Sequence, residues 1–214
     1  MESLFNSAQG GENREERLDE LARQVAVCTK CDLALNRTNT VFGTGDPYSP
    51  LMLVGEGPGE NEDATGLPFV GRAGKLLDDI LAAVDLTRQQ IYLTNIVKCR
   101  AAVEEGGRLK NRQPRMGEIR ACNPYLQGQI EAIKPEIILC LGGPAAKTVI
   151  DKDFRITKDR GKWYEVEGVK AMATFHPAYV LRQRGEDLQN TKRLVWKDIQ
   201  KVYAEYQKVM EERA

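Results

Sequence analysis

Two of the five cysteines in this chain of 214 residues form a C-x2-C pair. Cys28 and Cys31 can reach one metal centre from a single tight turn, whereas Cys99 and Cys122 follow singly much further along. Four thiolates suit either tetrahedral zinc or a cubane iron–sulfur cluster. Cys140 lies in the apolar stretch "IILCLGG" and is most simply a small buried residue. The alternative is that all five are structural thiols, because one C-x2-C pair is only a moderate signal.

The single histidine, His176, restricts the chemistry further. Metal sites that need two histidines, such as Cys2His2 zinc fingers, are excluded. His176 follows the apolar run "KAMATF" and precedes a proline that restricts the local backbone. Two other apolar runs also end in polar sequence: "LMLV" leads into "GEGPGENED", and "IYLTN" ends in Asn95. These three ends are therefore the candidate functional segments.

Elements of regular structure must bring these three ends together. Four apolar segments predict strands by their length and β-branched content: "LMLV", "IYLTNIV", "EIILCLG" and "KAMATF". Apolar residues at helical spacing predict helices from residue 14, over 76–84, over 115–133 with an interruption at "NPY", over 144–150, and from 190 onward. This alternation predicts a three-layer α/β/α fold around a mostly parallel four-stranded sheet. Ligands of such folds bind beyond the carboxyl ends of the strands, so the three polar ends are expected to share one crevice.

Composition sets the broad class of the protein. The apolar content of 42% and the charged content of 29% are ordinary for a globular protein, and no apolar run reaches membrane-spanning length. The start of the chain lacks the features of a secretory signal, which predicts a cytoplasmic protein without a membrane partner. Residues 1–13 are polar and are expected to be disordered, with a single domain over 14–214. A net charge of zero does not by itself indicate nucleic-acid binding.

The segments "GEGPGENEDATGLPFVGRAGKLLDDIL", "LTNIVKCR", "ITKDRGKWY" and "FHPAYVLR" together resemble the motif set of family 4 uracil-DNA glycosylases. The resemblance covers residues 18–209, with the motifs in family order. It implies the uracil-glycosylase fold, removal of uracil from single- or double-stranded DNA, and a monomeric enzyme. It also implies a 4Fe-4S cluster held by Cys28, Cys31, Cys99 and Cys122.

The resemblance assigns roles to the three strand ends. Backbone N–H groups around Gly57 are expected to donate to O2 of the departing uracil anion, together with His176. Phe69 is expected to stack on the flipped base. The Asn95 amide matches N3–H and O4 of uracil, whereas cytosine presents the opposite pattern. The full predicted site consists of Glu56, Gly57, Pro58, Glu62, Phe69, Asn95 and His176, with catalytic roles for His176, Asn95, Gly57 and Glu56.

DNA contacts follow from the same resemblance. Val180, Leu181 and Arg182 are expected to form a wedge that enters the duplex. Seven basic residues are candidate phosphate contacts: Lys98, Arg100, Lys110, Arg112, Arg115, Arg160 and Lys162. No lysine in the motif positions can form a Schiff base, so strand cleavage is not expected.

The resembled family differs from the better-known uracil glycosylases in the turn after the first strand, and this sequence shares the difference. Gly57 and Gly59 stand where better-known uracil glycosylases carry a water-activating Asp and a methyl-excluding aromatic residue, so Glu56 or Glu62 is the candidate acid. Glu62 is also the candidate to fill the space beside Gly59, unless the acidic run only favours the following helix. Extra residues in "AAVEEGGRLKNR" change a DNA-facing loop, and the loop lacks the histidine of a covalent branch.

Two alternative functions stay open at this point. One is a non-catalytic nucleic-acid-binding protein of the same fold, and the other is a glycosylase for another deaminated base. Phe69, Asn95 and His176 argue against the first alternative because a binding protein does not need them. Asn95 argues against the second alternative because its amide pattern favours uracil.

Overall fold

A computed structural model describes residues 13–214. Its helices are α1 (Arg14–Ala26), α2 (Leu33–Asn36), α3 (Glu60–Thr65), α4 (Arg72–Ala82), the 3-10 helix η1 (Arg88–Gln90), α5 (Met116–Ile133), α6 (Gly143–Val149), α7 (Ile156–Asp159), α8 (Pro177–Arg182) and α9 (Gly185–Arg213). Its strands are β1 (Thr44–Gly45), β2 (Leu51–Gly55), β3 (Tyr92–Asn95), β4 (Ala102–Glu105), β5 (Arg108–Asn111), β6 (Ile137–Leu141), β7 (Tyr164–Val166) and β8 (Val169–Thr174).

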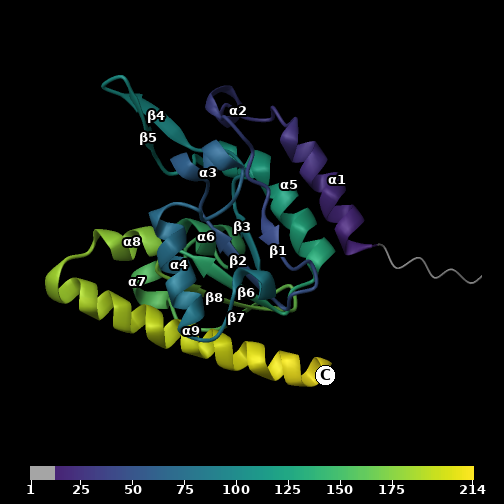
Figure 1. Ribbon diagram of the computed structural model, residues 1–214, viewed down its shortest axis with the longest axis vertical. Coiled ribbons are helices and arrows are strands. Elements are labelled where there is room, and N and C mark those ends of the chain that lie inside the picture. Colours follow the sequence, from purple (N-terminus) through teal and green to yellow (C-terminus); the bar gives the residue numbers. More distant parts are fainter. Residues whose placement is uncertain (1–12) are drawn as a thin grey trace, which may run out of the picture.

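The four predicted strands form the parallel centre of a six-stranded sheet in the order β1-β3-β2-β6-β8-β7 (Figure 1). The short edge strands β1 and β7 pair antiparallel and were not predicted, because two or three residues carry no periodic signal. The predicted mostly parallel sheet is therefore confirmed. The carboxyl ends of β2, β3 and β8 lie along one edge of the sheet, as the prediction of one shared crevice requires.

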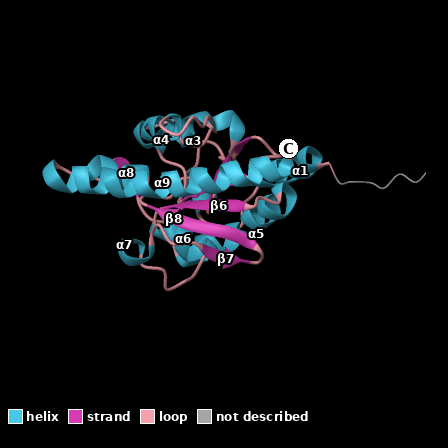
Figure 2. Ribbon diagram, turned by 90° about the horizontal axis from the view of Figure 1, so that it is seen from below, coloured by secondary structure: helices cyan, strands magenta, loops and turns pink. Residues whose placement is uncertain are grey.

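Helices cover both faces of this sheet, which confirms the three-layer fold (Figure 2). Alternate residues of β2 point to opposite faces: Met52 and Val54 pack with α5 and α6, whereas Leu51 and Leu53 pack with α4 and α9. Both sets are completely buried. Strands buried on both faces explain why the sequence shows continuous apolar runs instead of alternation.

Two helices differ from prediction. Helix α5 runs without interruption through Pro124, because proline removes one backbone donor while packing on the sheet and on α1 supports the rest of the helix. Helix α9 begins at Gly185, five residues earlier than expected, with Glu186 and Asp187 in its first turn. Acidic residues there interact favourably with the helix dipole.

The inserted segment forms the antiparallel hairpin β4–β5, where a loop was expected. Gly106 and Gly107 occupy the turn with φ of 62° and 73°, a conformation that glycine adopts without steric cost. The hairpin extends away from the central sheet (Figure 1).

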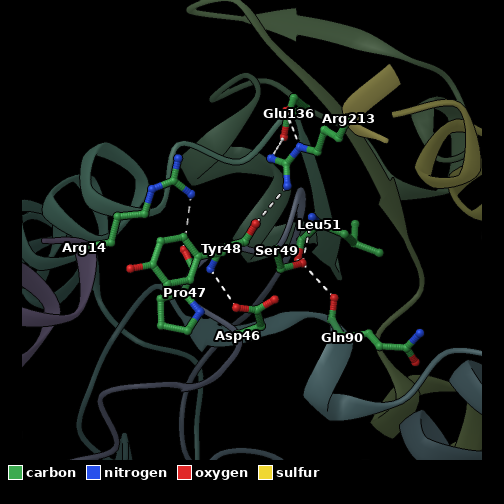
Figure 3. Close-up of polar contacts among 9 residues, drawn as sticks. All are labelled: Arg14, Asp46, Pro47, Tyr48, Ser49, Leu51, Gln90, Glu136 and Arg213. Carbon is green, nitrogen blue, oxygen red and sulfur yellow. Dashed lines mark hydrogen bonds and ion pairs between the residues drawn. The ribbon is translucent and has the colours of Figure 1, made fainter. Parts of the chain in front are cut away.

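The turn before β2 is tied to both ends of the described chain (Figure 3). Arg213, at the end of α9, donates from Nη1 to the Tyr48 carbonyl over 2.9 Å and pairs with Glu136 over 2.6 Å. The Arg14 guanidinium lies 5.3 Å from the centre of the Tyr48 ring. Ser49 Oγ has two carbonyl acceptors within reach, Leu51 O at 3.0 Å and Gln90 O of η1 at 2.8 Å. These contacts lie at the edge of the sheet opposite the polar strand ends.

Asn13 is the first described residue, and its side chain accepts a hydrogen bond from Glu15 N over 3.1 Å at the start of α1. Asn13 is therefore ordered, whereas the rest of the predicted disordered tail lies outside the described residues. Within residues 13–214, no helix is both long and apolar enough to cross a membrane.

Candidate active site

The three polar strand ends line one cavity of about 510 Å³. The ends of β2, β3 and β8 contribute Glu56, Asn95 and His176 respectively. All seven predicted uracil-binding residues lie in its wall, which is made up of Glu56, Gly57, Pro58, Gly59, Glu60, Asn61, Glu62, Phe69, Gly71, Arg72, Ala73, Asn95, Ala101, Asn111, Arg112, Gln113, Pro114, His176, Ala178 and Arg182. The predicted convergence is confirmed.

The amide of Asn95 lies over Gly55, its register partner on β2. A Cβ at Gly55 would lie 2.4 Å from Asn95 Oδ1 and 2.5 Å from Phe69 Cζ, so only glycine fits between these two side chains. Asn95 Oδ1 is buried and has no hydrogen-bond partner; among residues 13–214 only Asn123 Oδ1 shares this state. A buried acceptor without a donor costs free energy, which a ligand that carries an N–H group would recover.

Phe69 is held in a left-handed backbone conformation with φ of 55°, which is uncommon for an aromatic residue. Arg88 supports it: Nη2 donates to the Phe69 carbonyl, and Nη1 donates to the Pro68 carbonyl over 3.1 Å. The Phe69 and His176 rings lie 6.2 Å apart between centroids, with an angle of 29° between planes. These two nearly parallel rings form one side of the cavity.

His176 is a neutral donor in this environment. Its Nδ1 accepts a hydrogen bond from the Ala178 backbone N over 3.1 Å, so the proton of the neutral ring resides on Nε2. Burial lowers the pKa of His176 to about 4; the charge of Arg182 acts in the same direction, and Glu62 opposes it. The ring is therefore uncharged near neutral pH and offers Nε2–H as a donor.

The carboxylate of Glu62 is occupied by backbone donors. One oxygen accepts from Gly59 N over 3.0 Å, and the other accepts from Val70 N and Gly71 N over 2.9 Å and 2.8 Å. Glu62 therefore fixes the turn after β2 to the start of α4. Asp63 is used in the same way: both of its carboxylate oxygens accept from Thr38 N. The acidic run explains the folding of this turn and does not supply the missing Asp.

Glu56 is the second candidate acid, and its environment differs from that of Glu62. Burial raises the pKa of Glu56, and the positive charge of Arg182 partly offsets this increase. No donor in residues 13–214 forms a hydrogen bond with its carboxylate. A Cβ at the next residue, Gly57, would lie 2.8 Å from Val97 Cγ2, which leaves no room for an Asp there without movement of Val97.

Four of the five cysteines line a second, small cavity beside α1, α2 and α5: Cys28, Cys31, Cys99 and Cys122. Arg37 Nη1 donates to Cys99 Sγ over 3.4 Å, and Lys98 N donates to Cys122 Sγ over 3.3 Å. Yet no three potential ligands among the described residues converge closely enough to hold a single metal ion. Cys140 is completely buried within β6, as predicted.

A family model described as the uracil DNA glycosylase superfamily matches residues 42–200. A type-4 uracil-DNA glycosylase of Thermotoga maritima is 44% identical over 190 residues, which are 88% of this chain and 94% of the relative. The type-4 uracil-DNA glycosylase of Archaeoglobus fulgidus is 44% identical over 174 residues, covering 78% and 84% of the two chains. This chain belongs to the type-4 uracil-DNA glycosylase family. The predicted resemblance is thus confirmed.

Two of the three residues that the family resemblance assigned to a DNA wedge remain accessible. Leu181 is partly exposed and Arg182 is exposed at the end of α8. Val180, in contrast, is 2% exposed and packs in a cluster with Phe175 and Val195. The structure corrects the prediction for Val180, because the helical turn that presents its neighbours directs its side chain into the core.

Several residues that were predicted to contact phosphate form hydrogen bonds within the protein instead. Lys98 is 1% exposed, and burial lowers its pKa to about 7 while Cys122 opposes the shift. Arg112 forms two hydrogen bonds with Glu118, of 2.8 Å and 2.6 Å. Arg160 Nε donates to Asp198 over 2.7 Å. Arg100 is 8% exposed and donates to Asn111 Oδ1 and the Leu109 carbonyl.

Sequence reasoning missed three contributors to the site. Gly55 was interpreted only as the first residue of a turn, although "VGEGPG" shows a glycine directly after the apolar strand. Arg88 lies in a polar segment without any signal of its own. Asn111 lines the cavity from the base of the hairpin β4–β5. The sequence of this hairpin has no periodic pattern that predicts its strands.

Proposed function

We propose that this protein is a monofunctional uracil-DNA glycosylase. It hydrolyses the N-glycosidic bond of a flipped deoxyuridine, releases uracil and leaves an abasic site in the DNA without cutting the strand. One observation carries the proposal: the buried, unpartnered Oδ1 of Asn95 in a cavity that also holds Phe69 and His176. The N3–H group of uracil is the donor that this oxygen lacks.

Asn95 provides the selection against cytosine. With Oδ1 accepting from N3–H, its Nδ2 donates to O4 of uracil. Cytosine has an acceptor at N3 and an amino group at the position of O4, so both contacts become repulsive and two buried polar groups stay unpaired. Gly55 makes this readout possible because a side chain there would collide with the amide.

His176 stabilises the leaving group. Breaking the bond between C1′ and N1 leaves negative charge on O2 of uracil, and the Nε2–H group of a neutral imidazole donates to that oxygen. Backbone N–H groups around Gly57 are the second source of donors. Phe69 stacks on the base, and Glu56 orients the attacking water because Glu62 is already occupied.

The wedge consists of Leu181 and Arg182, which replace the flipped base in the stack. Arg182 also lines the cavity, where its charge meets the phosphate backbone beside the extruded nucleotide. We also propose that the enzyme is a monomer, as the family resemblance implies. A cytoplasmic location is part of the same proposal, because cysteines that bind a metal cluster are typical of a reducing compartment.

The test is excision from a single-stranded oligonucleotide with one uracil, followed by alkali to cut abasic sites. The wild type releases uracil, and Asn95→Ala lowers the rate by about 10²–10³-fold because two hydrogen bonds to the base are lost. His176→Ala lowers it by about 10²–10³-fold, the cost of one oxyanion donor. Omission of alkali leaves the strand intact.

Two outcomes would overturn this function. Tight binding of the uracil oligonucleotide without excision would favour the non-catalytic binding protein. Faster excision of hypoxanthine or xanthine than of uracil would favour a glycosylase for another deaminated base. A matched cytosine oligonucleotide, left intact by the wild type, serves as the control for base selection.

We also propose that Cys28, Cys31, Cys99 and Cys122 hold a 4Fe-4S cluster. The four thiols line one cavity, and a cubane cluster takes one thiolate at each of its four irons. The N–H groups of Arg37 and Lys98 reach two of the sulfurs, as expected around thiolates. The cluster would join the segment before α2 to α5, and hydrolysis needs no redox step.

Analysis of iron and acid-labile sulfide in anaerobically purified protein tests this assignment. Cys122→Ser is expected to lose iron, sulfide and the brown colour. Cys140→Ser, at the buried cysteine outside the cavity, is the matched control and is expected to retain all three. Stoichiometric zinc without sulfide would contradict the cluster.

A further inference from the structure

Lys98 lies between the two sites described above. It follows Asn95 by three residues and directly precedes Cys99. Its side chain is almost completely inaccessible, and within residues 13–214 none of its hydrogen bonds goes to a carboxylate. A buried lysine is costly unless its donors are satisfied, so its partners indicate what it does.

The ammonium group of Lys98 has three oxygen acceptors. Nζ donates to the backbone carbonyl of Asn95 over 2.7 Å, to Thr94 Oγ1 over 2.6 Å and to Gln129 Oε1 over 2.6 Å. Three oxygen acceptors around one nitrogen match the three donors of an ammonium group. The carbonyl of the residue assigned to read uracil is one of these acceptors.

The main chain of Lys98 contacts the cysteine site. Its N–H donates to Cys122 Sγ over 3.3 Å, and its carbonyl accepts from Val41 N over 2.8 Å. One residue thus touches a predicted cluster ligand with its backbone and Asn95 with its side chain.

Helix α5 contacts this segment at two points, through Cys122 and Gln129. The two residues are seven positions apart, which places them two turns apart on one face of the helix. Gln129 also donates from Nε2 to the Phe42 carbonyl over 3.0 Å, so its acceptor oxygen is fixed in direction toward Lys98. The helix therefore acts as a rigid support for residues 94–99.

The Asn95 amide depends on this support because its Oδ1 has no hydrogen bond within residues 13–214. What remains to orient the amide is the backbone of residue 95 and the close packing over Gly55. The backbone carbonyl of Asn95 is where Lys98 binds.

We propose that Lys98 is a positioning residue that fixes Asn95 relative to the four-cysteine site, so that the support of α5 sets the direction of the uracil-reading amide. This role rests on the proposed uracil-DNA glycosylase function. Lys98 was expected to contact phosphate. In this proposal it contributes to base selection without touching the DNA.

The experiment compares Lys98→Met with the wild type as purified holoenzymes. Lys98→Met keeps the length of the side chain and removes its donors. The expected result is unchanged iron content, free-uracil affinity lowered by at least about tenfold, and kcat lowered by a similar factor. KM for the oligonucleotide is expected to stay within about twofold, because Lys98 is buried away from the DNA.

Two further variants keep this test decisive. Gln129→Leu removes one acceptor while Lys98 remains, and it is expected to lower uracil affinity by a smaller factor. Lys201→Met is the matched control. Lys201 lies on α9 and donates to the Gly161 carbonyl over 2.7 Å, so its replacement should not change uracil affinity. If Lys98→Met does not fold, the Gln129→Leu result decides.

Wild-type uracil affinity and kcat in both Lys98→Met and Gln129→Leu would overturn the inference. A wild type that excises no uracil would overturn the proposed function instead. In that case the link is judged from the side-chain amide signal of Asn95 in a nitrogen-15 spectrum, assigned with Asn95→Ala. A signal that shifts in Lys98→Met but not in Lys201→Met supports the link, and an unmoved signal contradicts it.

Discussion

At the scale of single residues, the site depends on which polar groups the fold leaves unpaired. Glu62 gives both carboxylate oxygens to backbone N–H groups, whereas Asn95 Oδ1 has no partner. His176 uses Nδ1 for the backbone and leaves Nε2–H available. The residues assigned to bind the base are thus distinguished from their polar neighbours by the contacts that they do not make.

The lowered pKa of His176 predicts a dependence of stability on pH. Its folded pKa of about 4 lies below the ordinary value of 6.5, so the unfolded chain takes up a proton first as pH falls. Stability is therefore lost progressively between these two values. Between about pH 7 and about pH 5 the loss is up to about 2 kcal/mol. Urea unfolding of wild type and His176→Gln measures it, and equal slopes against pH would contradict the prediction.

Replacement of Glu62 tests its structural role. Glu62→Gln keeps one acceptor oxygen but places an NH2 group against a backbone donor, so we expect a loss of about 1–3 kcal/mol in the free energy of unfolding. Weaker uracil binding is expected as well, because Val70 follows Phe69, the residue proposed to stack on the base. Glu186→Gln, in the exposed first turn of α9, is the control and should change neither quantity.

At the scale of elements, the hairpin β4–β5 divides into a base and a tip. Asn111, at the base, lines the cavity and accepts from Arg100 Nε over 2.7 Å. The tip is exposed on both strands, and Leu109 and Val103 remain 43% and 48% accessible. The base therefore belongs to the active-site wall, whereas the tip has no partner in residues 13–214 apart from the hairpin itself and Arg100.

Shortening the tip should separate these two parts. Deletion of Glu104, Glu105, Arg108 and Leu109 joins Val103 through Gly106-Gly107 to Lys110 and keeps the register of the remaining pairs. We expect kcat on the uracil oligonucleotide to stay within about twofold and stability to change by less than about 1 kcal/mol. A loss of kcat would show that the tip reaches the reacting nucleotide, and a rise in KM alone would assign it to DNA binding.

At the scale of the whole molecule, α9 is joined to the sheet by a buried ion pair. Asp198 is 1% exposed and accepts from Arg160 Nε and from Thr174 Oγ1, each over 2.7 Å. Thr174 ends β8, two residues before His176. The Asp198 carboxylate therefore both holds the longest described helix against the sheet and contacts the strand end that leads to His176.

Removal of that carboxylate should be costly. Asp198→Ala removes the carboxylate that neutralises the Arg160 guanidinium and leaves it only the Leu194 carbonyl as an acceptor. We expect a loss of about 3–5 kcal/mol in the free energy of unfolding, because a mostly buried charge then lacks its counter-charge. Arg213→Ala is the comparison: it breaks the more accessible pair with Glu136 and should cost less than about 1 kcal/mol. Chemical denaturation measures both, and similar losses would contradict the argument.

The sequence alone determined the layer architecture, the family and the three strand ends that form the cavity. Long apolar runs, helical periodicity and motif order are local properties that can be read along the chain. The single histidine and Asn95 were identified for the same reason, because each directly follows or ends such a run.

Only the tertiary structure decided what the charged residues do. Lys98 and Arg160 were predicted to contact phosphate, but each has a partner in a distant segment, at Gln129 and Asp198 respectively. The direction of Val180 into the core likewise depends on where α8 lies against α9. The sequence does not show which partner a charged residue has, because burial and pairing arise only when segments far apart in the chain come into contact.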